Sequence, residues 1–423
     1  MSRRFVSIVA VATLAASSFG ATPAVSKGED VGMSSERLNR IGPMIQSHID
    51  GHDFSGAVTL VARKGKVVHF EAHGLADVEA KKAMARDTLF RLASMTKPVT
   101  AVSILMLLEA GKLVLSDPVS KFVPEYKDPK VAVWNLPNDP AGAGLRLVPA
   151  AREITIQDLL THTSGLANGF EGPAGEYVRR ANLPSGGSLD ERVKRAAGLP
   201  LNFQPGTQWE YSPSTGFDTL GRIVEIVSGM TLDQFFKTRV FEPLGMKDTF
   251  FTVPANRTAD VTVAYTKGEH GLSRPQPPAA RAESGGPYFS GAGGLTGSAA
   301  DYLAFSQMLL NGGQLDGVRL LGRKTVELMT SDAIGSLDLG NYAGDQVLKG
   351  YGFGLGVRVR RSTGDNGWMG SPGDFGWAGA LGTYFWIDPK EQIVAVYMSQ
   401  APSPIRAYYR KLFKQLVYAA IVD

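Results

Sequence analysis

The chain contains no cysteine among its 423 residues. This absence excludes a disulfide framework, a thiol nucleophile and a metal site built from thiolates. The chain also lacks a Gly-x-Ser-x-Gly segment, the turn that carries the serine of α/β-hydrolases. Neither a Gly-x-Gly-x-x-Gly segment nor a phosphate-binding loop occurs, so no motif indicates nucleotide-dependent chemistry.

Strong charge of one sign is also missing. The formal net charge is +4 for the whole chain, and the basic residues form no run of five or more. We therefore expect no nucleic-acid partner. Apolar residues make up 43% of the chain and charged residues 20%, which is ordinary for a globular protein with room for two or more domains.

Residues 1–24 resemble a secretory signal. Arg3 and Arg4 precede an apolar run from Phe5 to Ala16. Thr22-Pro23-Ala24 could precede a signal-peptide cleavage site. The apolar run is too short for a stable membrane anchor. We expect a periplasmic or secreted protein, and leave the cleavage position and export route open.

Residue periodicity predicts strands near both ends of the chain and helices between them. The expected strands are 55–62, 66–72, 352–359, 380–387 and 393–399. The expected helices are 34–50, 94–110, 155–160, 193–197, 215–228, 232–241, 299–310, 323–330 and 405–422. Stretches 127–152, 167–190 and 254–290 are expected to be loops that wall a pocket.

This order favours an α/β (α+β) fold in which the terminal segments form one antiparallel sheet covered by the first and last helices. We predict a sheet domain from 25–92 and 340–423. A helical region from 93–339 would be inserted into it.

The segment Ser94-Met95-Thr96-Lys97 opens the predicted helix 94–110. Residues three apart share a helix face, so the Ser94 hydroxyl and the Lys97 amine can touch. Apolar residues surround the pair, and desolvation would disfavour the ammonium form of Lys97. A neutral amine beside a hydroxyl is a general base beside a nucleophile. The alternative is a capping serine followed by a solvated lysine.

Two further segments could complete such a site. Tyr211 lies between a Pro-Gly turn and the predicted helix 215–228, and it could share a proton with Lys97 or be an ordinary half-buried phenol. Gly376-Trp377-Ala378-Gly379-Ala380 lies on or just before a predicted strand. An N–H from that strand and the Ser94 N–H could hold an oxyanion, although such glycines also mark turns.

Histidines offer weaker candidates. His48 and His52 are four apart on the first helix, but without a third nearby ligand they indicate a surface pair rather than a metal site. His162, before Thr163-Ser164-Gly165, could pair with a serine or hold the turn that ends its helix. We expect neither a metal nor a cofactor.

The ordered set of Ser94-x-x-Lys97, Tyr211-Ser212 and a Gly-bearing triplet near the C-terminus resembles the serine β-lactamase and penicillin-binding-protein superfamily. Leu159–Leu166 and Gly293-Gly294-Leu295 add local matches. Within the superfamily, the chain looks most like the family VIII carboxylesterases, which have a class C β-lactamase fold. The likeness covers about residues 34–420.

The resemblance implies a role for each position. Ser94 matches the acylated nucleophile, Lys97 its base, and Tyr211 the tyrosine that opens the second motif. Ser94 and Ala380 would supply the oxyanion N–H groups. The resemblance also suggests substrate contacts, at Trp377, Ala378, Gly379 and Asn168.

Two departures favour esters over lactams. Pro213 replaces the asparagine that grips a lactam side chain, and Trp377 replaces the lysine that steers a lactam carboxylate. We therefore predict a serine carboxylesterase for small ester substrates with short acyl chains. The alternatives are a β-lactamase, a D-amino-acid peptidase or acyltransferase, and a non-catalytic penicillin-recognising protein. The oligomeric state stays open.

Overall fold

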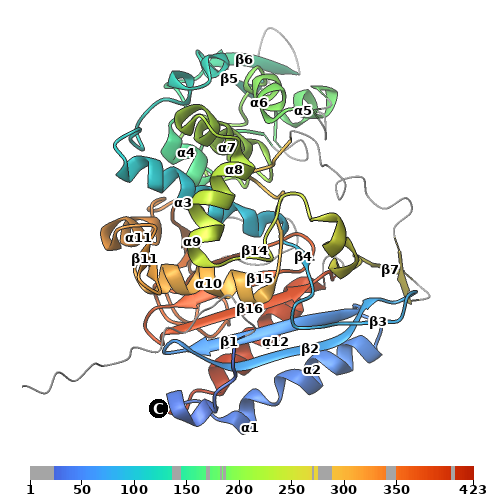
Figure 1. Ribbon diagram of the computed structural model, residues 1–423. Coiled ribbons are helices and arrows are strands. Elements are labelled where there is room, and N and C mark those ends of the chain that lie inside the picture. The colour runs from blue at the N-terminus through green and yellow to red at the C-terminus, as the bar shows by residue number, and fades with distance from the viewer. Residues whose placement is uncertain are drawn as a thin grey trace, which may run out of the picture.

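The protein is built on one eight-stranded antiparallel sheet that combines the two ends of the chain (Figure 1). The computed structural model describes residues 23–135, 144–167, 172–181, 183, 187–268, 271–274, 288–339, 349–401 and 405–423. The sheet order is β12-β13-β14-β15-β16-β1-β2-β3. Its strands are β1 Gly56–Arg63, β2 Lys66–Asp77, β3 Lys82–Ala83, β12 Tyr351–Phe353, β13 Arg358–Arg360, β14 Phe375–Ala378, β15 Tyr384–Asp388 and β16 Ile393–Ser399.

Pairing of β1 with β16 joins the N-terminal hairpin to the C-terminal strands, with Ala57 opposite Ser399 and Arg63 opposite Ile393. The hairpin β1–β2 turns at Lys64 and Gly65, whose φ angles are +51° and +75°. Two successive left-handed residues match the twist of a tight hairpin. The strands expected at 55–62 and 66–72 therefore pair with each other as a hairpin.

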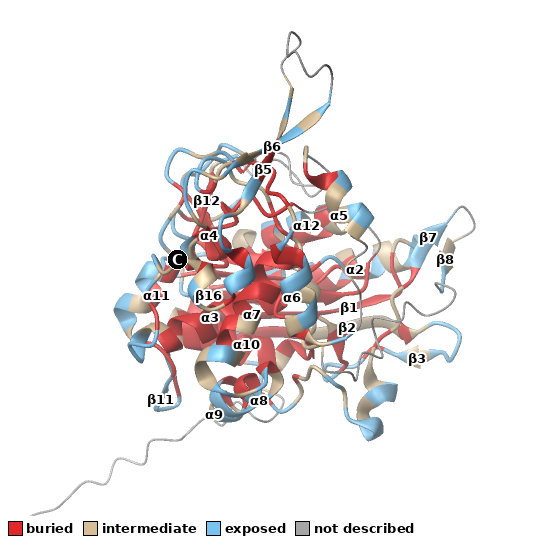
Figure 2. Cartoon of the chain, turned by 90° about the horizontal axis from the view of Figure 1, so that it is seen from above, coloured by how far each residue is buried: buried red, intermediate tan, exposed pale blue. Residues whose placement is uncertain are grey.

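One face of the sheet is covered by α1 Ser35–Leu38, α2 Ile41–Asp50 and α12 Arg406–Ala419. In Figure 1, α1 and α2 lie below the strands and α12 lies behind β1 and β2. The other face carries α10 Ala299–Leu310, packed on β1, β15 and β16. Above it lie α3 Thr96–Glu109, α4 Ile156–Thr161 and α7 Thr215–Ser228. Seen from above, α3, α7 and α10 form the buried centre of the molecule (Figure 2).

The remaining elements surround this core. The helices are α5 Gly175–Ala181, α6 Leu189–Ala197, α8 Leu232–Phe236, the π-helical turn η5 Lys237–Phe241, α9 Glu242–Leu244 and α11 Arg323–Met329. The small hairpins are β5 Lys130–Trp134 with β6 Leu145–Pro149, β7 Thr266–Gly268 with β8 Gly271–Ser273, and β10 Gln314–Leu315 with β11 Val318–Arg319. β4 Phe90–Arg91 pairs with β9 Thr296–Gly297. The 3₁₀ turns are η1 Gly28–Val31, η2 Ala93–Met95, η3 Val119–Lys121, η4 Pro124–Tyr126 and η6 Ala255–Asp260.

Several predicted boundaries are wrong for local reasons. The strand expected at 352–359 is two strands, β12 and β13, because the chain turns at Gly354–Gly356 and Gly356 has φ +82°. The helix expected at 34–50 breaks between α1 and α2. The expected loops also contain structure: β5 and β6 lie in 127–152, α5 in 167–190, and η6, β7 and β8 in 254–290.

The α/β fold class with its antiparallel sheet is confirmed. The domain limits at 93 and 339 stay a prediction, and α10 inside that span lies directly on the sheet. Residues 1–22 of the predicted signal lie outside the described residues, so export also stays a prediction. No helix in the described ranges is long and apolar enough to cross a membrane.

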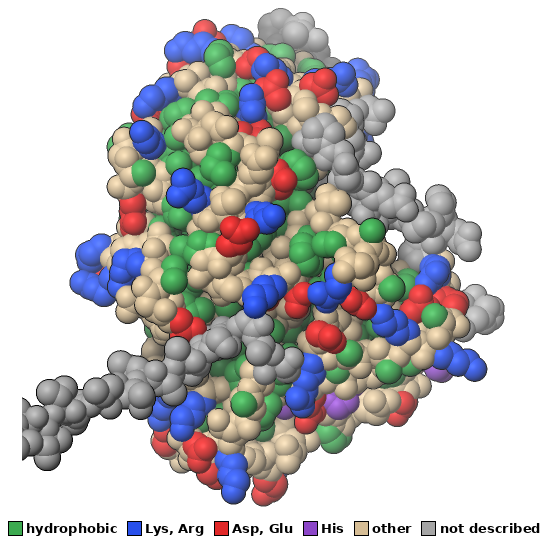
Figure 3. Space-filling view, viewed as in Figure 1, with side chains coloured by type: hydrophobic (Ala, Val, Ile, Leu, Met, Phe, Trp, Pro, Cys, Tyr) green, Lys and Arg blue, Asp and Glu red, His purple; other side chains and the backbone are tan. Residues whose placement is uncertain are grey.

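Charge is mixed on the face of the molecule that Figure 3 draws. On the face drawn in Figure 3, acidic and basic side chains alternate among apolar ones, and the coloured residues show no stripe of one sign.

A buried ion cluster fixes the start of β14. Asp374 Oδ2 accepts from Arg360 Nε at 2.8 Å and from Lys414 Nζ at 3.0 Å, which ties β13 and α12 to the residue before β14. All three side chains are at most 2% exposed. The carboxylate is therefore the shared counter-ion of two buried cations.

We predict that Asp374→Asn lowers the free energy of unfolding by about 3–5 kcal/mol, because it leaves Arg360 and Lys414 buried without that carboxylate. Urea unfolding measures the change. Asp316→Asn, in an exposed turn with φ +47°, is the matched control and should stay within about 0.5 kcal/mol of the parent. Equal losses for the two variants would contradict the role given to the cluster.

Candidate active site

Ser94 lies where the chain passes from β4 into α3. The residue before it, Ala93, has φ +48°, a left-handed conformation that is uncommon for a residue with a side chain. The 3₁₀ turn η2 then leads directly into α3. This sharp change of direction leaves Ser94 partly exposed at the start of a helix whose following residues are buried.

Lys97 is fully buried one turn later. Its Nζ lies 3.2 Å from Ser94 Oγ, 2.7 Å from the Pro213 carbonyl oxygen and 2.9 Å from the Ala292 carbonyl oxygen. The Tyr211 ring centroid is 5.0 Å away. The predicted contact of Ser94 with Lys97 is therefore present, and a solvated lysine is excluded.

Tyr211 completes the cluster from the segment before α7. Its hydroxyl donates to Ser94 Oγ at 2.7 Å, and the residue is only 3% exposed. Ser94 Oγ therefore contacts both other groups. The structure therefore brings Tyr211 into contact with the Ser94–Lys97 pair, from which it is far apart in the sequence.

Two protonation states fit this geometry without movement of heavy atoms. An ammonium at Lys97 donates its three N–H groups to two carbonyls and to Ser94 Oγ. A neutral amine donates to the two carbonyls and accepts the Ser94 hydroxyl proton on its lone pair. Tyr211 can donate to Ser94 Oγ in both states.

The Ala292 carbonyl is held in place by a polar group on α7. The buried Asp218 carboxylate accepts from Tyr288 Oη at 2.6 Å, from Ser290 Oγ at 2.7 Å and from Ala292 N at 3.3 Å. Thr100 Oγ1 donates to the Gly291 carbonyl at 2.6 Å. These bonds fix the segment that carries a partner of Lys97, and none of them was predicted from the sequence.

The expected oxyanion segment lies beside the residues before Ser94. Gly379 packs against Leu92 so closely that a Cβ there would overlap the Leu92 carbonyl oxygen. Ala380 lies in the turn after β14 rather than on a strand, and is exposed. The Ala380 carbonyl accepts from Arg406 at 2.6 Å, and the Gly379 carbonyl accepts from Arg410 at 2.6 Å.

The predicted substrate contacts divide between the two faces of β14. The Trp377 ring is buried 5.3 Å from the Tyr211 ring, on the side of Ser94. Ala378 packs instead with the apolar cluster of α2 and α12, so its side chain lies on the opposite face of the sheet. Asn168 falls outside the described residues.

His162 ends α4 with φ +59°, as the interpretation of a turn-holding residue predicts. Its Nδ1 accepts from Ser212 N at 3.3 Å, which gives the ring a backbone partner in place of a serine hydroxyl. The described residues contain no group of three or more side chains able to hold a metal ion. His48 instead pairs with Asp53 at 2.9 Å.

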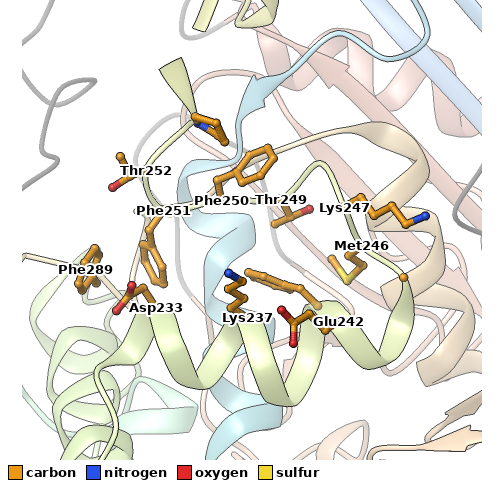
Figure 4. A pocket seen from close by; sticks show the side chains of 13 residues that line it. Asp233, Lys237, Glu242, Met246, Lys247, Thr249, Phe250, Phe251, Thr252 and Phe289 are labelled. Carbon is orange, nitrogen blue, oxygen red and sulfur yellow. The ribbon is translucent and has the colours of Figure 1, made fainter. Parts of the chain in front are cut away.

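A separate hollow of about 550 Å³ lies between the α8–α9 helix and the segment 249–252 (Figure 4). Phe241, Phe250, Phe251 and Phe289 supply much of its apolar wall. Phe250 pairs with Thr296, and Thr296 pairs with Arg91 of β4. Ser94, Lys97 and Tyr211 do not line this hollow.

The Beta-lactamase family model matches residues 43–418 of the chain. The chain belongs to this family. Protein Rv1367c of Mycobacterium tuberculosis is 40% identical over 321 residues, which cover 74% of this chain and 77% of that protein. Esterase EstB of Burkholderia gladioli is 36% identical over 269 residues, covering 59% of this chain and 64% of EstB.

Among solved structures, EstCE1, a hydrolase with promiscuous acyltransferase activity, superimposes with a TM-score of 0.77 and 27% identity. The match covers 91% of this chain and 99% of EstCE1. The predicted β-lactamase-like family and the assignment to its serine hydrolases are therefore confirmed.

We predict that Tyr211→Phe lowers kcat for ester hydrolysis by about 10²–10⁴-fold, because the ring keeps its packing while the hydroxyl on Ser94 is lost. Steady-state kinetics measure the loss. Tyr126→Phe removes another buried hydroxyl, which bonds Thr219, and should leave kcat unchanged. A Tyr211→Phe enzyme as active as this control would exclude proton transfer by Tyr211.

We also predict that Gly379→Ala lowers kcat by about 10²-fold or more, because the new methyl group pushes the Ala380 segment away from Leu92 and Ser94. Gly198→Ala is the control, since Gly198 is exposed, has φ −76° and has its nearest neighbouring atom 3.9 Å from the added Cβ. If Gly379→Ala retained full kcat, this close approach would be irrelevant to catalysis.

Proposed function

We propose that the protein is a serine carboxylesterase that forms an acyl-enzyme on Ser94. The observation that carries this proposal is the direct contact of Ser94 Oγ with Lys97 Nζ at 3.2 Å and with Tyr211 Oη at 2.7 Å. A nucleophile is thereby bonded to two groups that can exchange its proton. The names of EstB, an esterase, and of EstCE1, a hydrolase, support the same chemistry.

In the first half-reaction, Ser94 Oγ attacks the carbonyl carbon of the ester and its proton passes to Lys97 Nζ. The tetrahedral intermediate collapses when the bond to the alkoxy oxygen breaks. Tyr211 protonates the departing alcohol and recovers a proton from Lys97. In the second half, water gives a proton to the Lys97–Tyr211 pair and attacks the acyl carbonyl carbon. The bond from that carbon to Ser94 Oγ then breaks, the pair returns the proton to Ser94 Oγ, and the acid leaves.

Negative charge develops on the carbonyl oxygen in both tetrahedral intermediates. We propose the backbone N–H groups of Ser94 and Ala380 as its two donors. Ser94 N is at the start of a helix, where N–H groups point outward. The packing of Gly379 on Leu92 supports the second donor, because it brings the residue before Ala380 against the segment that leads into Ser94.

The wall beside Tyr211 favours uncharged esters over β-lactams. Trp377 offers an apolar ring there, packed edge-on against Phe353 at 5.2 Å, and carries no positive charge for an ion pair with a carboxylate. Pro213 presents its backbone carbonyl to Lys97 and has no side-chain amide for a lactam. Both features match the departures from β-lactamases in the sequence.

Acyl transfer to an alcohol is the second candidate. It uses the same acyl-enzyme, with an alcohol in place of water in the second half-reaction. The observation that favours it is the described activity of EstCE1, a hydrolase with promiscuous acyltransferase activity. Adding a short alcohol to the ester assay and measuring the new ester tests this candidate.

We predict that turnover of p-nitrophenyl acetate or butyrate exceeds turnover of a chromogenic cephalosporin, and that Ser94→Ala abolishes both. Mass spectrometry after a fluorophosphonate should place one added group on Ser94. Ser103→Ala, at a buried hydroxyl farther along α3, is the control and should stay active. A large preference for the cephalosporin would make the protein a β-lactamase, and absence of labelling would indicate a non-catalytic protein.

A further inference from the structure

His162 lies directly behind Tyr211. Its ring is 1% exposed and its centroid is 4.7 Å from the Tyr211 ring. Phe353 at 5.1 Å and Phe217 at 5.2 Å pack around the same imidazole. The imidazole is therefore a fixed part of the wall against which the tyrosine ring rests.

Two hydrogen bonds connect His162 to the residues on both sides of Tyr211. The Glu210 N–H donates to the His162 carbonyl oxygen at 3.1 Å, and the Ser212 N–H donates to His162 Nδ1 at 3.3 Å. One residue thus holds the backbone before and after the tyrosine. The left-handed backbone of His162, at the end of α4, directs both acceptors to this segment.

The bond from Ser212 also sets the state of the ring. An imidazole nitrogen that accepts a hydrogen bond from a backbone N–H group carries no proton itself. Nδ1 of His162 is therefore unprotonated, and the proton of the neutral ring is on Nε2. Burial, followed by the nearby charge of Lys97, lowers the pKa of His162 well below its ordinary value. The neutral ring that the hydrogen bond requires is therefore the stable form at neutral pH.

We propose that His162 is a positioning residue that sets the place of the Tyr211 hydroxyl relative to Ser94. The inference rests on the proposed function, because it concerns the proton that Tyr211 transfers. The Tyr211 hydroxyl must stay within hydrogen-bond reach of Ser94 Oγ, and a displacement of about 1 Å can cost about 10²-fold in rate. His162 is no base for Ser94, since its Nδ1 is occupied by the Ser212 N–H.

The test compares two substitutions of similar shape. His162→Asn keeps a polar atom near the position of Nδ1 and tolerates a positive φ. His162→Leu has the same branching and no acceptor. We expect His162→Leu to lose about 10²-fold in kcat with little change in KM, and His162→Asn to stay within about tenfold of the parent.

Rates are expressed per reactive site, counted from the end point of fluorophosphonate labelling, so that unfolded protein does not enter kcat. The rate of labelling is measured as well, because it reports on Ser94 without assuming an ester substrate. Should His162→Leu fail to fold, His162→Gln replaces it, since its amide lies near the position of Nε2 and leaves Nδ1 without a substitute.

The deciding measurement repeats the substitutions in a Tyr211→Phe background. If His162 acts through the tyrosine hydroxyl, His162→Leu should cost less than about threefold there, because that hydroxyl is already gone. A residue with only a structural role would cost the same factor in both backgrounds, and that result would overturn the inference.

The two proposals fail in different ways. A fully active His162→Leu enzyme beside an impaired Tyr211→Phe enzyme would overturn the positioning role alone. A fully active Tyr211→Phe enzyme would instead overturn the mechanism in which Tyr211 transfers a proton.

Discussion

The site depends on the burial of one amine. Lys97 Nζ has no access to water and is paired with two backbone carbonyls and one hydroxyl. An unpaired buried amine would cost several kcal/mol, so its partners must be in place whenever the chain is folded. The partners come from η2, from the segment before α7 and from the segment before β9. Folding of the core therefore assembles the site.

This requirement explains why many hydrogen bonds hold the segments that carry Ser94, Lys97 and Tyr211 and their partners, rather than the three side chains themselves. Asp218 holds the Ala292 segment and His162 holds the Tyr211 segment, and both are buried in the helical half. Neither contacts Ser94 in this arrangement. Their effect is to fix backbone groups and one ring of the proton-transfer network, in which a displacement of about 1 Å can cost about 10²-fold in rate.

The sequence predicted the local half of this arrangement well. Ser94 and Lys97 are three residues apart at the start of a strongly apolar helix, and that spacing allows the contact that the structure shows. Helix α7, from Thr215 to Ser228, and strand β16, from Ile393 to Ser399, also match their predictions because their apolar patterns are uninterrupted. Tyr211 was different. The residues left open whether it meets the Ser94–Lys97 pair, the family resemblance favoured that contact, and the contact depends on tertiary packing.

The features that the sequence did not predict depend on contacts between distant segments or on backbone groups, and neither shows in a local residue pattern. The strand β14 reads Phe375-Gly376-Trp377-Ala378, where two small residues hide the alternation of a strand. Its position is fixed by the ion cluster around Asp374, whose partners lie on β13 and α12. Pro213 and Ala292 bind Lys97 Nζ through their backbone carbonyls. Every residue has such a carbonyl, so the residue type does not reveal this role. Asp218 looked like an ordinary member of its helix, and His162 was interpreted only as the holder of a turn or the partner of a serine.

The same reasoning accounts for the position of the proposed oxyanion donors. One belongs to η2 and the other to the turn after β14, two elements that no local pattern connects. The turn is held from behind, where Arg410 of α12 donates to the carbonyls of Gly379 at 2.6 Å and Thr383 at 3.1 Å. It is held from the front by Thr383 Oγ1, which donates to the Leu92 carbonyl at 3.0 Å. Because Gly379 lacks a side chain, these bonds can close the gap to Leu92. They fix the turn that carries Ala380 relative to the segment before Ser94.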